Sequence, residues 1–99
     1  MVTYEITATV QPDLIERYEN YMIDRHIPDL MATGYFASAT FSRNSGRYRI
    51  RYDANNLEDL GKYLKEHAGR LREDFAQHFP TGIELKRDTW DVVTAFFSE

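Results

Sequence analysis

The chain has 99 residues, of which 42% are hydrophobic and 28% charged, a composition typical of one soluble globular domain spanning residues 1–99. It contains no cysteine, which excludes disulfide frameworks, cysteine-based zinc and iron–sulfur sites and thiol nucleophiles. Its net charge of −4 disfavours nonspecific binding to nucleic acid.

Targeting signals and membrane spans are also missing from the sequence pattern. No apolar run approaches the roughly 18 residues that a membrane-spanning helix needs. The first residues lack the basic and apolar regions of a signal peptide. We therefore expect a cytoplasmic protein that makes no use of a membrane.

The first half of the chain predicts a strand, a helix and a second strand. Residues 2–10 alternate between apolar and polar side chains, the period of a strand buried on one face. Asp13 begins a helix that continues to about Asp24, because Pro28 disfavours helical geometry at the residue before it. Pro28 can open a further turn, over 28–32, which Gly34 ends. Residues 35–42 then read as a strand.

The second half predicts a strand, a long helix and a final strand. A turn at 44–46 leads into a strictly alternating strand over 47–53, so the two strands form a hairpin. A single helix follows, capped by Asn55 or Asn56 and closed by Pro80. Its apolar stripe consists of Leu57, Leu60, Leu64, His67, Ala68, Leu71, Phe75 and Phe79. The last strand spans about 83–93.

The order β-α-β-β-α-β predicts an α+β fold. Two amphipathic helices can bury their apolar stripes together only on one face of a four-stranded antiparallel sheet. This is the ferredoxin-like arrangement, and it leaves the second face of the sheet without helices.

The uncovered sheet face is predicted to be polar and partly basic. The segment from Tyr35 to Tyr52 contains four arginines and no acid, so it carries +4 and the rest of the chain −8. Three of these arginines, at 47, 49 and 51, share one strand face. Beyond the last strand, the apolar segment over 94–97 is expected to pack on its own domain or on a neighbouring chain.

Two histidine-centred motifs resemble a known family. They are Arg25-His26-Ile27-Pro28 with Ala32-Thr33-Gly34, and Tyr63 through Glu66-His67-Ala68 and Leu71-Arg72 to Phe79-Pro80. The chain resembles, over nearly its whole length, a family of short uncharacterised bacterial proteins classed as a domain of unknown function and similar to the dimeric α/β-barrel superfamily. The resemblance implies a homodimer in which two sheets pack by their free faces into a barrel. Relatives often have proline after the His-Ala pair, whereas Gly69 stands here.

The histidines are the first candidates for chemistry. His67 lies on the apolar stripe of the second helix, where it is either a general base, a haem ligand or a satisfied core residue. His26 lies where the first helix is expected to break, which aims it into a cleft or lets it satisfy freed carbonyls. His78 lies at the end of the predicted second helix, where the helix dipole stabilises a positive charge. Their spacing predicts no metal site, and no motif predicts a bound cofactor.

The remaining candidates would bind a ligand. Arg49 and Arg51, with Arg47, either form an anion site inside a barrel or pair with acids such as Glu5, Glu84 and Asp88. Tyr52 and Trp90 offer flat walls for an aromatic ligand, and aromatic residues at strand spacing are also typical of a core. Arg72 is placed near the mouth of the predicted pocket.

Four hypotheses for function follow. The first is a small-molecule binding protein, with a pocket between helices and sheet lined by His26, Tyr52, His67 and Trp90, for an aromatic or acidic ligand. The second is a cofactor-free monooxygenase- or isomerase-like enzyme that uses His67 or His26 as a base, so enzyme activity stays open. The third is a haem protein with His67 as ligand. The fourth, an RNA-recognition module, is rejected because residues 45–52 do not fit the required motif.

Overall fold

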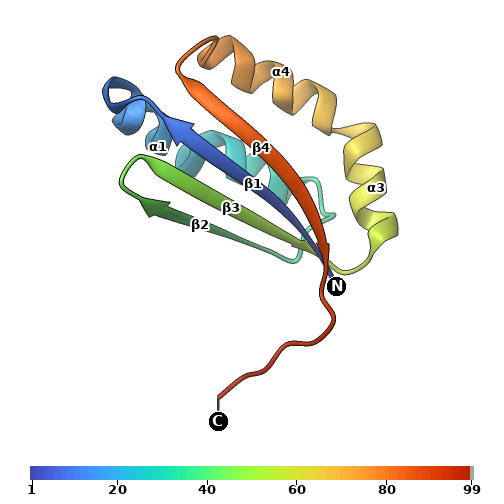
Figure 1. Cartoon of the computed structure of the whole chain (residues 1–99). Helices are drawn as coiled ribbons and strands as arrows, with labels where there is room; N and C mark the ends of the chain where they lie inside the picture. The colour runs from blue at the N-terminus through green and yellow to red at the C-terminus, as the bar shows by residue number, and fades with distance from the viewer. Residues whose placement is uncertain (99) are drawn as a thin grey trace.

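The computed structural model describes residues 1–98 and has the ferredoxin-like fold. Four antiparallel strands form one sheet in the order β2-β3-β1-β4 (Figure 1). The elements are β1 (Val2–Val10), η1 (Pro12–Leu14), α1 (Ile15–Tyr21), η2 (Met22–His26), α2 (Ile27–Ala32), β2 (Ser38–Asn44), β3 (Arg47–Ala54), α3 (Leu57–Glu66), α4 (Ala68–His78) and β4 (Ile83–Asp91). The predicted fold class and element order are therefore confirmed.

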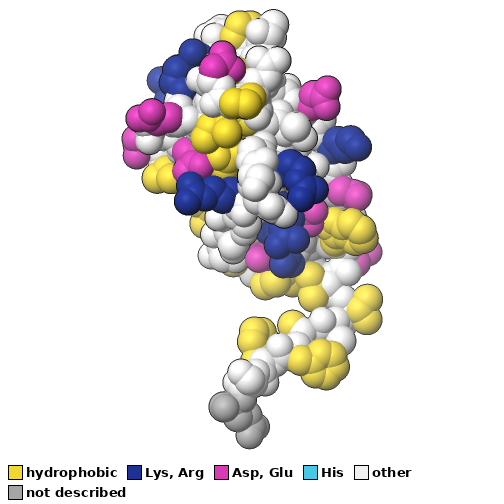
Figure 2. Space-filling model, turned by 60° about the vertical axis from the view of Figure 1, so that its left-hand side comes forward, with side chains coloured by type: hydrophobic (Ala, Val, Ile, Leu, Met, Phe, Trp, Pro, Cys, Tyr) yellow, Lys and Arg dark blue, Asp and Glu magenta, His cyan; other side chains and the backbone are white. Residues whose placement is uncertain are grey.

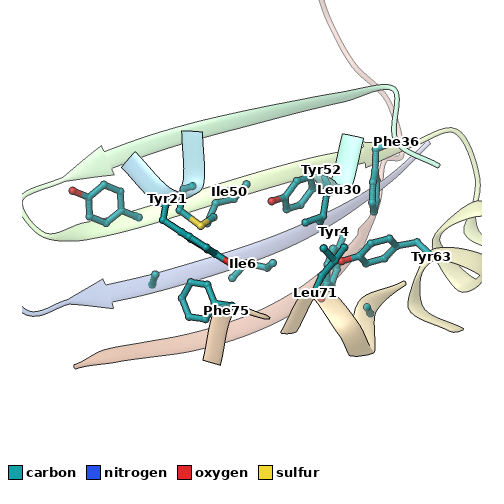
Figure 3. Close-up of a cluster of buried hydrophobic side chains, with 14 of the residues drawn as sticks. Tyr4, Ile6, Tyr21, Leu30, Phe36, Ile50, Tyr52, Tyr63, Leu71 and Phe75 are labelled. Atoms are coloured by element: carbon teal, nitrogen blue, oxygen red, sulfur yellow. The ribbon is translucent and has the colours of Figure 1, made fainter. Parts of the chain in front are cut away.

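The core lies between the helices and one face of the sheet. The even-numbered side chains of β1 are all buried, as its alternation predicts. They pack with apolar side chains from β3 and from every long helical segment. Figure 3 shows Tyr4, Tyr52, Phe36 and Tyr63 grouped in one part of this core, and Tyr21 and Phe75 in another.

The first helical region does not end at Asp24, so that prediction is wrong. Helical backbone continues to Ala32, and residues 22–26 form a wider π-helical turn. The amide of Ile27 donates to the carbonyl of Met22, five residues back, instead of four. The wider turn accommodates Pro28, which has no N–H and whose ring would crowd the carbonyl four residues before it.

The second helical region is two helices instead of one, because the backbone breaks at His67. His67 has φ −127° and ψ −32°, outside helical geometry, and it separates α3 from α4. The stripe is also shorter than predicted, since Leu57 is 63% exposed and Leu64 is 39% exposed. Both leucines lie in α3, of which only Leu60 and Tyr63 are buried.

Two strand boundaries differ from the predicted ones. The hairpin strand β2 begins at Ser38 instead of residue 35, because Tyr35 and Phe36 lie in the loop, where Phe36 packs inward on Tyr4 and Tyr63. β4 ends at Asp91, two residues early. Past it, the tail (residues 93–98) stands clear of the body of the molecule in Figures 1 and 2. Val93, Phe96 and Phe97 are 95%, 90% and 88% exposed, so the tail does not pack on its own domain.

Candidate functional site

A narrow cavity lies between the sheet and the helices, and its lining defines the candidate site. Its volume is about 30 Å³, enough for one or two waters or the tip of a ligand. Apolar side chains from both layers, including Ile6, Ile50 and Phe75, form most of its wall. Its polar lining comes from Tyr4, Tyr18, Tyr63, His26, Arg72 and Arg87.

His26 is brought to this cavity by the π-helical turn. The side chain is only 8% exposed, and its ring stacks on Tyr21 with centroids 5.7 Å apart and meets the edge of Phe75 at 5.7 Å. Nδ1 is buried and has no hydrogen-bond partner within residues 1–98. Buried polar atoms are nearly always paired, so this nitrogen is an unused hydrogen-bonding group.

Burial keeps the His26 ring neutral. Loss of hydration lowers the pKa of His26 to about 4, and the charge of Arg87 adds to this effect. The carboxylates of Asp29 and Asp74 oppose the shift without reversing it. At neutral pH the ring therefore offers one N–H donor and one nitrogen acceptor, with no charge of its own.

A hydrogen-bond network around Asp74 holds the wall behind His26. The Tyr21 hydroxyl donates to Oδ2 of Asp74 at 2.6 Å, and Nη2 of Arg25 lies 2.7 Å from Oδ1. These contacts, with the Tyr21 bond foremost, lower the pKa of the Asp74 carboxyl. Asp74 on α4 thus fixes the Tyr21 ring on which His26 stacks.

Two arginines at the cavity are not engaged by acids. Nη2 of Arg72 donates to the Tyr4 hydroxyl at 3.0 Å. Arg87 lies opposite Ile6 in the β1–β4 ladder, so its side chain is on the helix-covered face of the sheet. Neither guanidinium has a carboxylate oxygen within 4 Å in the described part of the chain. The site therefore combines one neutral buried imidazole with two cations.

His67 lies outside the cavity, at the break between α3 and α4. Its ring lies beside those of Tyr35 and Tyr63, with centroids 5.9 and 6.4 Å away, and Nη2 of Arg70 is 2.9 Å from Nδ1. A haem needs space for its ring plane beside an axial ligand. The cavity of about 30 Å³ is far too small for one and does not include His67, so these residues do not fit haem.

Tyr52 is a core residue and does not line the cavity. It is fully buried beside the rings of Tyr4 and Phe36, and its hydroxyl has no partner among the residues described. Burial raises the pKa of its hydroxyl.

Trp90, Arg49 and Arg51 all lie on the open face of the sheet. Trp90 is paired with Thr3 in the ladder, and Thr3 points away from the helices, so the placement of Trp90 in the helix–sheet pocket is wrong. The reason is the register of β4, which puts its even-numbered residues on the open face. Arg49 borders an open groove of about 620 Å³ between β2 and β4, together with Arg47 and Lys86.

The open face carries balanced charge that is not paired within one chain. By register it holds the basic residues Arg47, Arg49, Arg51 and Lys86 and the acidic residues Glu5, Asp53, Glu84 and Asp88. Glu5 lies directly opposite Arg51, yet no open-face pair comes within 4 Å across residues 1–98. The expected cross-strand ion pairs are therefore not formed in the single chain.

The described residues contain neither a cluster of metal-binding side chains nor a membrane-spanning helix. Within the described residues, no three or more histidine, aspartate or glutamate side chains converge on one point. Over the same residues, no helix has the length and apolar character to cross a membrane.

Comparison with known families supports the resemblance. The family model of a domain of unknown function, DUF4286, matches residues 1–92. The chain belongs to the DUF4286 family. No curated protein matches it. The resemblance to an uncharacterised family is thus confirmed.

Solved structures share the fold at low sequence identity. A provisionally named antibiotic biosynthesis monooxygenase from Deinococcus radiodurans is 15% identical, with a TM-score of 0.70 over 100% of this chain and 99% of that one. A protein of the same provisional name from Nitrosomonas europaea is 9% identical, with a TM-score of 0.73 over 95% and 100%. A de novo designed ferredoxin-fold protein is 20% identical, with a TM-score of 0.54 over 98% and 90%. These similarities establish only the fold. Because a designed protein also has this fold, the fold by itself does not indicate a function.

Sequence reasoning named two of the residues that line the cavity and missed the others. His26 and Arg72 were predicted and do line it, whereas Tyr4, Tyr63 and Arg87 were not named as site residues. Tyr4 and Tyr63 look like ordinary core positions in the pattern. Arg87 carried a usable signal, because its place in β4 alternates with open-face residues and follows Ile83 and Leu85 on the buried face.

Proposed function

We propose that this protein binds a small organic molecule in the cavity between the helices and the sheet. The observation that carries the proposal is the buried, unpartnered Nδ1 of His26 beside a cavity. A buried nitrogen without a hydrogen-bond partner costs about 1–3 kcal/mol of folding free energy. A ligand that hydrogen-bonds to Nδ1 would remove this cost. Apolar walls with a few convergent polar groups are typical of ligand sites.

The size of the cavity limits how a ligand would sit. A volume of about 30 Å³ admits one small polar group, so the rest of the molecule would lie at the mouth, beside Arg72 and Arg87. The π-helical turn forms one wall, and such turns are frequent at functional sites.

A ligand screen read by two-dimensional amide NMR tests the proposal. Aromatic acids and quinones are added to the labelled protein, and amide shifts around residues 22–28 and on α4 are followed. We expect a subset to shift these amides, and we expect His26→Ala to weaken binding about tenfold because one hydrogen bond is lost. His78→Ala serves as the matched control, since His78 does not line the cavity. Shifts unaffected by His26→Ala would place binding elsewhere.

A monooxygenase- or isomerase-like activity is the second candidate, and the shared fold of the provisionally named monooxygenases supports it. In a monooxygenase reaction of this kind the base removes the proton of a phenolic hydroxyl, and the resulting phenolate has carbanion character at a ring carbon. Dioxygen then oxidises that carbon, with one oxygen atom entering the product and the other leaving as water. We assign this role to His26 because it lines the cavity, although a pKa of about 4 makes it a weak base at neutral pH. Oxygen uptake with phenolic substrates, absent in His26→Ala, would favour the enzyme.

We also propose that two chains pair through the open sheet face, as the resemblance implies. Four basic and four acidic residues that form no ion pair with one another within residues 1–98 can pair with those of a second copy, and the balanced charge of the face argues against nucleic acid as the partner. Light scattering at micromolar concentration is expected to give a dimer. Arg49→Glu should weaken the dimer, whereas Arg70→Glu on the far side should not.

We keep the cytoplasm as the proposed location of the protein. Cell fractionation tests this.

A further inference from the structure

The two cavity arginines lack the acidic or carbonyl partner that three other arginines have, as the open-face arginines and Arg70 also do. Arg25 pairs with Asp74 and Arg43 with Glu19, while Arg17 donates to the carbonyl of His78 at 2.6 Å. Arg72 has only the neutral Tyr4 hydroxyl as partner. Arg87 has no hydrogen-bond or ion-pair partner in the portion of the chain described.

Arg87 is an exposed residue of β4, which is an edge strand of the sheet. On the helix-covered side of β4 it follows Ile83 and Leu85, both of which pack against the core. An arginine continuing that apolar row brings a permanent charge to the edge of a low-dielectric cavity, where charge interactions are stronger than in water. Its charge already acts on His26, whose pKa it lowers.

We infer that the ligand of this site is a small organic acid, whose carboxylate is bound by Arg72 and Arg87 and whose adjoining polar group hydrogen-bonds to His26. The inference rests on the proposed ligand-binding function and names its substrate class. Guanidinium groups bind carboxylates by short, charge-assisted hydrogen bonds, which are roughly twice as strong as neutral ones. The imidazole is neutral, so it adds a directional hydrogen bond without adding charge.

The charge balance of the site favours a monoanion. The lining contains two cations and no carboxylate, so one bound carboxylate would leave it mildly positive. The cavity wall is apolar and would penalise a second charge away from the arginines, while the body of the ligand lies at the mouth. The chain as a whole is acidic, with net charge −4, so anion binding would come from this local arrangement and not from overall charge.

Benzoate and benzamide test this inference, because they match in shape and differ in charge. Each is titrated into the labelled full chain near pH 7 and followed by amide NMR up to about 10 mM, a range set by the affinity expected for so few atoms. We expect benzoate to bind about tenfold more tightly than benzamide. A bound carboxylate should also raise the pKa of His26, read from its ring proton shifts.

Three variants assign the preference to residues. Arg87→Met and Arg72→Met should each reduce the benzoate preference to near unity, while leaving benzamide binding in place. Arg70→Met is the matched control, since Arg70 lies on the same helix as Arg72 and does not line the cavity. Both cavity arginines are exposed enough for the variants to fold, and an unchanged melting temperature would verify this.

The outcomes separate the two proposals. If benzamide binds as tightly as benzoate, or the preference persists in both arginine variants, the acid inference is wrong while ligand binding stands. If neither probe shifts any cavity amide, both proposals are contradicted.

Discussion

At the scale of single residues, the fold buries two polar side-chain atoms that have no hydrogen-bond partner, and one of them borders the candidate site. His26 Nδ1 and the Tyr52 hydroxyl are the two buried side-chain atoms without a partner within residues 1–98. They differ in context, because His26 borders a cavity whereas Tyr52 lies in packed core. The first is therefore a candidate for ligand contact and the second a cost to stability. Each gives a prediction.

The low pKa of His26 predicts that stability falls in mild acid. In the unfolded chain His26 takes up a proton near pH 6.5, whereas in the native protein it does so only near pH 4. Between these two pH values, protonation of His26 therefore favours the unfolded state. Asp29 and Asp74 face the ring and oppose this effect, and Arg87 reinforces it. The unfolding free energy should drop by about 2 kcal/mol from pH 7 to pH 5. Urea unfolding of His26→Phe should show a much shallower drop; an equal one would refute the assignment.

The unpartnered Tyr52 hydroxyl predicts that its removal does no harm. Tyr52→Phe should be neutral or stabilising by up to about 1 kcal/mol, because the buried hydroxyl loses its desolvation cost. Tyr48→Phe is the matched comparison, since the Tyr48 hydroxyl donates to Glu19, and it should lose about 1 kcal/mol. Chemical denaturation of both variants measures the difference. Equal losses would mean that Tyr52 has a partner such as a buried water.

At the scale of elements, the two helical regions are shaped by departures from regular helix. The π-helical turn brings His26 to the cavity, and the break at His67 redirects the chain between α3 and α4. Both occur at motifs that the sequence analysis marked as histidine-centred. In the first the histidine lines the site, and in the second it lies at the junction beside Tyr35 and Tyr63. The similar motifs therefore serve different purposes.

Alanine substitutions at two glycines are expected to change the stability of the fold in opposite directions. Gly82 connects α4 to β4 with φ +91°, and a Cβ there would lie 2.5 Å from Leu14 Cδ1. Gly82→Ala should therefore destabilise the fold by about 2 kcal/mol, from backbone strain and displacement of Leu14. Gly61 lies within α3 with open space around it, so Gly61→Ala should stabilise by about 0.5–1 kcal/mol. Thermal or urea unfolding compares them, and a stabilising Gly82→Ala would contradict this account of the turn.

At the scale of the whole molecule, the single chain leaves two surfaces unfinished. One is the open sheet face with its unpaired charges, and the other is the tail with Val93, Phe96 and Phe97 in water. The tail leaves β4 beside the N-terminus, where the amide of Val92 donates to the carbonyl of Met1 at 3.0 Å. Exposed apolar side chains next to a face of balanced charge are what a second copy would cover.

Truncation after Val92 tests the contribution of the tail to the dimer. The shortened chain should keep its fold, since the apolar side chains of the tail make no core contact. The dimer should weaken about tenfold or more, because large apolar side chains contribute about 1.5–3 kcal/mol each when fully buried. Sedimentation velocity over a dilution series measures this, and the Phe96→Ser, Phe97→Ser double variant is the matched full-length control. An unchanged dissociation constant would exclude the tail from the interface.

The sequence predicted the fold well because the fold depends on short-range patterns. The alternation in β1 and β3 and the order of elements were enough to assign the sheet and its helix-covered face. The site was predicted only in part. His26 and Arg72 were found from motifs, whereas Arg87 was missed, although its alternation with Ile83 and Leu85 indicates the helix-covered face that the register of β4 against β1 gives it. The register of β4 also places Trp90 on the open face of the sheet and not in the predicted helix–sheet pocket.

The amino-acid sequence by itself thus determined the ferredoxin-like topology and the absence of cysteine chemistry, since both follow from residue types and their spacing. Only the tertiary structure decided which polar groups converge. A one-residue difference in strand register exchanges the two faces of β4, and a wider helical turn rotates His26 inward. Such choices depend on packing between distant segments, so the neutral imidazole and the two arginines meet only once the chain has folded.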